Sequence, residues 1–70
     1  MPGTIQAAAT KVRRMRSGSK FILVVKTKVE DPGAQVEALA SGSGKQLALL
    51  GSDVVNKNGQ TVTLIKIRVN

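Results

Sequence analysis

The strongest local constraint on the fold of this 70-residue chain is the dipeptide Asn58-Gly59, which separates two apolar runs. Asn and Gly tolerate the positive φ angles that two-residue β-hairpin turns require. Residues 60–69 alternate between two faces, which is the period of a strand, and residues 46–55 form the preceding apolar run. Because Gly inside a strand pattern often marks a bulge, we expect a kink at Gly51. The C-terminal part of the chain therefore predicts an antiparallel hairpin.

Two further segments complete the predicted domain. Residues 20–29 are rich in β-branched side chains and read as a strand. Segment 32–41 fits two structures. As a helix it has Asp31 as N-cap, Pro32 in the first position and Gly42 after its end; as a strand it places small apolar residues on one face. We expect a small mainly-β domain with antiparallel strands at about 20–29, 46–55 and 60–69, or alternatively an α+β domain with a short helix at 32–41.

The first 19 residues contain no acidic residue and have helical character. Ile5, Ala8, Ala9 and Val12 form one apolar stripe, and Ser17-Gly18-Ser19 follows as a helix terminator. The sequence thus predicts a basic, partly helical N-terminal arm over residues 1–19 and a single small β-rich domain over residues 20–70. An acid-free amphipathic start also fits an organelle transit peptide, which is the alternative interpretation.

The composition argues against an enzyme. The chain has no Cys and no His, so disulfides, thiolate ligands and imidazole bases are all excluded. The four acidic residues offer poor material for a cation cage, and Ser43-Gly44-Lys45 lacks the spacing of a phosphate-binding P-loop. The longest apolar run, residues 21–25, is far too short to span a bilayer. We therefore expect no catalytic residues, no metal, no cofactor, no small-molecule substrate and no membrane partner.

The charge balance points to a nucleic-acid partner. Eleven Lys and Arg against four acidic residues give a net charge of +7, and five of these bases lie in residues 1–20. Phe21 is the only aromatic residue, so the chain has no platform on which unpaired bases could stack. A chain this short also has marginal stability and usually needs a stabilising partner. These features together favour contacts with phosphates rather than with bases.

The basic residues of two strands follow one pattern. Residues 22, 24, 26 and 28, like residues 62, 64, 66 and 68, run apolar, apolar, basic, basic along one strand face. Parallel strands would gather these cations in one patch, whereas antiparallel strands would place them at opposite ends. The candidate phosphate contacts are Lys11, Arg13, Arg14, Arg16, Lys20, Lys26, Lys28, Lys57, Lys66 and Arg68.

Two family resemblances add to this interpretation. Ile22-Leu23-Val24, Gly33 and a Leu-rich segment running into Asp53-Val54-Val55 occur at nearly ungapped spacing. In these segments the chain resembles the bacterial-type large-subunit ribosomal protein number thirty-three family, especially its mitochondrial form, which implies a β-rich protein embedded in ribosomal RNA. Residues 50–59, ahead of the last strand, are also similar to the basic hairpin of the Alba family of chromatin and RNA-binding proteins; that resemblance requires the helix at 32–41.

The leading functional hypothesis is a non-enzymatic, RNA-binding structural component of a ribosome or another ribonucleoprotein. It would lie within the cell, in a mitochondrial or cytoplasmic ribosome, against ribosomal RNA and neighbouring proteins of the assembly. The alternatives are a DNA-binding, chromatin-like module and a viral or phage structural protein.

Overall fold

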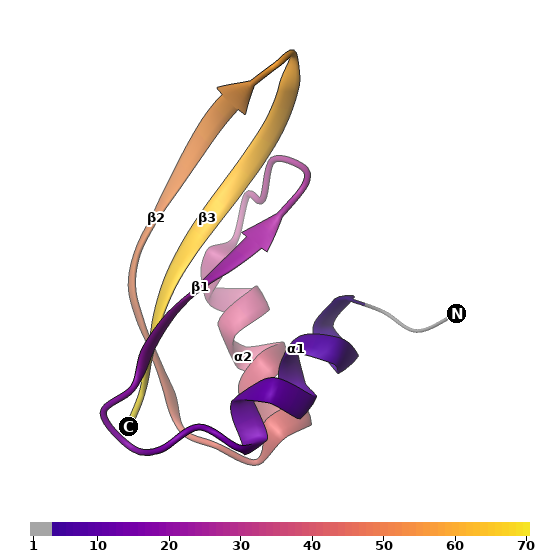
Figure 1. Ribbon diagram of the computed structural model, residues 1–70. Helices are drawn as coiled ribbons and strands as arrows, with labels where there is room; N and C mark the ends of the chain where they lie inside the picture. Colours follow the sequence, from indigo (N-terminus) through magenta and orange to yellow (C-terminus); the bar gives the residue numbers. More distant parts are fainter. Residues whose placement is uncertain (1–3) are drawn as a thin grey trace.

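The computed structural model describes residues 4–70, and their side chains from Ala7 onward. Two helices cover one face of a three-stranded antiparallel sheet whose strand order is β1-β3-β2 (Figure 1). The expected antiparallel strands are thus confirmed, and the fold also contains two helices. The elements in chain order are α1 (Thr4–Arg13), β1 (Lys20–Val25), α2 (Pro32–Ser43), β2 (Leu47–Lys57) and β3 (Gln60–Val69).

The hairpin between β2 and β3 forms as the sequence predicts. Asn58 and Gly59 have φ angles of 53° and 75°, and Lys57 pairs directly with Gln60 across the turn. Both turn residues therefore adopt the left-handed backbone that a two-residue hairpin needs. The register shifts between Leu49 and Gly51, which confirms the expected irregularity at this glycine.

The strand expected over residues 20–29 is shorter than predicted, because β1 ends at Val25. Beyond Val25, hydrogen bonds to the side chain of Thr63 on β3 take the place of the backbone hydrogen bonds between the two strands. Thr63 is fully buried. Its hydroxyl accepts a hydrogen bond from the Val29 amide at 2.9 Å and donates one to the Thr27 carbonyl at 2.7 Å. These bonds satisfy backbone groups that the sheet no longer pairs, and they turn the chain toward α2.

The ambiguous segment at 32–41 is a helix, so the α+β alternative describes the fold. The Asp31 carboxylate accepts a hydrogen bond from the Ala34 amide at 3.2 Å, and Pro32 occupies the first turn, as expected. The helix ends at Gly44, with φ of 70°, rather than at Gly42. Gly42 instead lies where α1 and α2 approach closely, since an added Cβ would be 3.2 Å from that of Ala9.

The N-terminal helix belongs to the hydrophobic core of the whole chain. Ala9 and Val12 are buried together with Leu23, Leu39 and Ile65, which come from β1, α2 and β3. The helical character predicted for the first 19 residues is observed, although the side chain of Ile5 lies outside the described residues. The core runs without a break across the boundary that we expected at residue 19.

Replacing Thr63 with Val should destabilise the fold by about 2 kcal/mol, because the Val29 amide and the Thr27 carbonyl would both lose their partner. Urea unfolding of the wild type and the variant measures this difference. Thr61→Val is the matched control, since Thr61 lies two residues earlier on the same strand face and makes no such bonds. Equal losses in the two variants would contradict the assignment.

Candidate nucleic-acid interface

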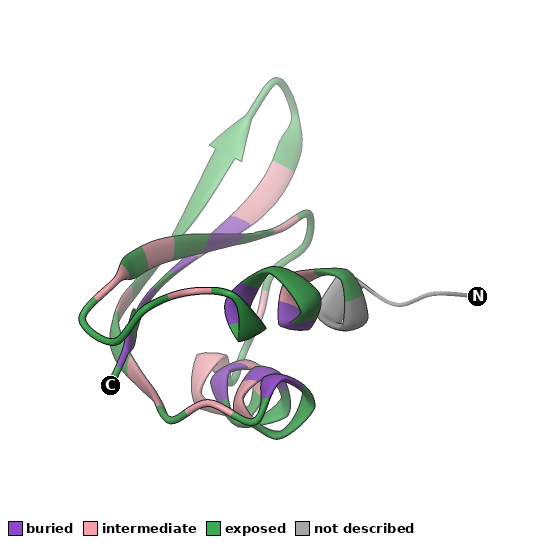
Figure 2. Ribbon diagram, turned by 60° about the horizontal axis from the view of Figure 1, so that its bottom comes forward, coloured by how far each residue is buried: buried purple, intermediate pink, exposed green. Residues whose placement is uncertain are grey.

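The two faces of the sheet differ sharply in burial. On β3, Thr63, Ile65 and Ile67 point toward the helices and are fully buried, whereas the intervening Lys66 and Arg68 are exposed. The side of the sheet away from the helices is called the open face here. Most of β2 and the hairpin turn is exposed (Figure 2), and Lys66 and Arg68 are exposed on β3, so this face is accessible to a large partner.

Three cations gather at one end of the open face. The antiparallel register places Lys20 directly opposite Arg68, and Lys66 opposite Ile22 on the same face. Lys20, Lys66 and Arg68 are called the cation cluster. Among the described residues, no carboxylate forms a salt bridge with any of them. Since like charges directly opposite each other destabilise a strand pair, the cluster carries an electrostatic cost that a bound anion would relieve.

The loop between α1 and β1 adds further cations to this end of the sheet. Its Gly18 amide donates to the Val69 carbonyl at 2.6 Å, and the Val69 amide donates to the Ser19 carbonyl at 2.8 Å. These bonds hold the loop against the end of β3, at the end of the sheet where the cation cluster lies. Arg14 and Arg16 are exposed in this loop.

Lys45 lies at the same end of the sheet and was not among the predicted contacts. The Asn70 amide donates to the Gln46 carbonyl at 2.9 Å, which fixes the start of β2 beside the end of β3. Lys45, just before this point, is half-buried. The position of Lys45 could have been predicted by extending the pairing of β2 with β3 from the turn to the far ends of both strands, because this pairing brings residues 46 and 70 together.

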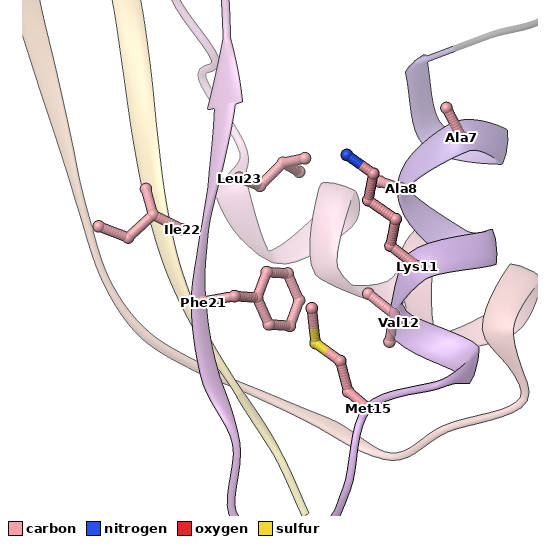
Figure 3. A pocket seen from close by; sticks show the side chains of 8 residues that line it. All are labelled: Ala7, Ala8, Lys11, Val12, Met15, Phe21, Ile22 and Leu23. Carbon is pink, nitrogen blue, oxygen red and sulfur yellow. The ribbon is translucent and has the colours of Figure 1, made fainter.

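The structure does not bring the other predicted contacts to the cluster. Lys11 reaches from α1 toward Leu23, across a cleft of about 290 Å³ between α1 and β1 (Figure 3). The Arg13 guanidinium donates to the Gly42 carbonyl at 3.1 Å and so serves the end of α2. The remaining three cations lie away from the cluster: Lys26 and Lys28 in the loop beyond β1, and Lys57 beside the hairpin turn. The antiparallel alternative, with cations at opposite ends, is therefore the one observed.

Apolar side chains border the cation cluster on the open face. Ile22 is 54% exposed and Leu50 is 50% exposed, although both are large aliphatic residues. The side chains of Lys20 and Lys66, with the strand segment at Phe21, complete the lining of a shallow hollow of about 310 Å³. The cluster thus offers charged groups beside an apolar floor and has no aromatic ring on its exposed surface for a base to stack on, because Phe21 faces the helices.

Neither a metal-ligand group nor a membrane-spanning helix is found in residues 4–70. These residues contain no group of three Asp, Glu, His or Cys side chains placed to hold a metal ion. No helix in this part of the chain is long and apolar enough to cross a membrane.

The fold and the site define a small, basic, two-layer α+β domain with a cationic end on its open face. No family model matches the chain, and no curated protein and no solved structure matches it either.

Replacing Lys20 with Gln should stabilise the isolated protein at low salt by a few tenths of a kcal/mol, because it removes the like-charge pair with Arg68. The gain should disappear above about 0.5 M NaCl, where screening is strong. Urea unfolding at several salt concentrations measures both effects. Lys28→Gln is the control, since Lys28 lies outside the cluster; an equal gain in that variant would show that net charge alone is responsible.

Proposed function

We propose that this protein is a non-enzymatic component of a ribosome or another ribonucleoprotein that binds the phosphate backbone of RNA. The observation that carries the proposal is the cation cluster, in which Lys20 faces Arg68 and Lys66 follows on the same surface. Three positive charges held together without acidic partners match a dense row of phosphates. Arg14 and Arg16 are exposed in the adjoining loop, at the same end of the sheet.

The scarcity of aromatic side chains supports binding to the phosphate backbone of RNA rather than recognition of its bases. Proteins that read unpaired RNA bases commonly stack them on aromatic side chains, and the one ring of this chain packs against the core. Double-stranded RNA, in contrast, is recognised mostly by its shape and through phosphate and 2′-hydroxyl contacts. The proposed partner is accordingly a base-paired RNA region, such as those of ribosomal RNA.

Duplex DNA is the second candidate, and one structural observation favours it. The resemblance to the Alba family requires a helix over residues 32–41 followed by a strand and a basic hairpin. The order β1, α2, β2, β3 agrees with that requirement, and the hairpin projects beyond both helices (Figure 1). The same cation cluster would then bind the phosphates of a DNA duplex.

The triple variant Lys20→Gln, Lys66→Gln, Arg68→Gln should lose affinity for a 20-base-pair RNA duplex because it lacks three phosphate contacts. The plot of log affinity against log salt should become shallower by about 2 to 3 units. Fluorescence anisotropy at several salt concentrations provides both values. The charge-matched control is Lys11→Gln, Lys26→Gln, Lys28→Gln, which removes three cations away from the cluster.

The outcomes separate the candidates. Tighter binding to the RNA duplex than to a DNA duplex of equal length supports the RNA proposal, whereas the reverse order supports the DNA candidate. Equal losses of affinity in the two triple variants would show that the cation cluster has no special role in binding. No binding of the wild type to either duplex at low salt would overturn both functions.

A further inference from the structure

The outer edge of β2 is unpaired in the described part of the chain. β2 pairs with β3 on one side only, because the strand order places it at the edge of the sheet. Its length of 11 residues exceeds the six of β1, the other edge strand. An unpaired edge presents a row of backbone amides and carbonyls that can pair with another strand, and long exposed edges are rare unless something covers them.

The side chains of β2 give this edge an apolar character. Six large hydrophobic side chains are exposed among residues 7–70, and four of them lie on β2: Leu49, Leu50, Val54 and Val55. The strand contains no Pro and has a single Lys, at its end. Of the features by which edge strands usually resist pairing, the strand has the bulge at Leu49/Gly51 and the charges Asp53 and Lys57, but it has no Pro and is not short.

The bulge and the alternation of side chains restrict how such an edge can pair with itself. The register shift at Leu49/Gly51 leaves residues 52–57 as the regular part of the strand. In this regular part, Asp53, Val55 and Lys57 point to the open face, because the β3 residues directly opposite them lie on that face. Pairing a second copy antiparallel around Val55 keeps like faces together and places Asp53 of each chain opposite Lys57 of the other.

We propose that two copies of this chain associate through their β2 edges, antiparallel and centred on Val55, with two Asp53–Lys57 pairs between the chains. Opposite charges on directly facing residues stabilise a strand pair and fix its register. Centring the pairing on Asp53 instead would set two carboxylates against each other. Charge thus selects one register over its neighbour.

These two charges cannot pair within one chain. Asp53 and Lys57 are four residues apart on a single strand, which corresponds to about 13 Å at the usual rise. Across the sheet they face Leu64 and Gln60, neither of which is charged. An interaction between Asp53 and Lys57 therefore reports contact between two chains.

The fold leaves room for this association. The hairpin projects beyond α1 and α2 (Figure 1), so the helices do not flank the centre of the proposed contact. A two-fold axis perpendicular to the sheet would join two three-stranded sheets into one of six strands. Both open faces would then point the same way, with the two cation clusters roughly 35 Å apart along the strand direction by strand rise. Only this last consequence for nucleic-acid binding rests on the proposed function.

Charge reversal tests the register. Asp53→Lys and Lys57→Asp should each weaken self-association by about tenfold or more, because like charges would face each other between the chains. The double variant, Asp53→Lys with Lys57→Asp, should restore association close to that of the wild type. Sedimentation equilibrium without nucleic acid measures each dissociation constant, and we expect a wild-type value below about 1 mM, as for a small interface.

The controls separate this proposal from loss of folding and from the proposed function. Circular dichroism identifies any variant that unfolds; Lys57→Asp, beside the turn, tests the pairing even if Asp53→Lys destabilises the fold. The triple variant of the cation cluster should associate like the wild type. Failure of the double variant to regain association, or a wild type that stays monomeric at about 1 mM, would overturn the proposal.

Discussion

The fold depends on the burial of one face of β3. This strand pairs on both sides, with β1 and with β2, and its side chains Thr63, Ile65, Ile67 and Val69 are fully buried. The two helices have no other apolar surface of comparable extent to cover. Because the fully buried apolar side chains of the described residues are all aliphatic, close packing on this face is the main source of the stability of the domain.

The parts of the fold that local chemistry determines could be predicted from the sequence. Asn58-Gly59 specified the hairpin because few residue pairs accept its backbone angles, and the alternation along residues 60–69 predicted the last strand. Segment 32–41 stayed ambiguous because its small side chains fit both the period of a helix and the period of a strand. The contact between Gly42 and Ala9 favours the helix, and that contact joins residues far apart in the chain. The early end of β1 also depends on residues far apart in the chain, since the hydroxyl of Thr63 forms the hydrogen bonds that backbone pairing would otherwise supply.

The candidate site shows a similar division. The apolar-to-basic pattern correctly placed Lys66 and Arg68 on the exposed face of a strand. It could not give the relative direction of two strands that are distant in sequence, so it left open whether Lys26 and Lys28 would lie beside them or at the opposite end. The antiparallel register selects Lys20, and the termination of β1 removes Lys26 and Lys28 from the sheet. The role of Arg13 at the end of α2 also depends on a tertiary contact.

Asp53 connects the two proposals. It is the only acidic residue on the three strands, and it lies on the open face, diagonal to Lys66 of the cation cluster. A free carboxylate there would repel the phosphates that the cluster attracts. In the proposed pairing of β2 edges, Lys57 of the second chain faces this carboxylate and offsets its charge. Association of two chains would therefore make the open face more uniformly positive, so that self-association and phosphate binding favour each other through the same side chain.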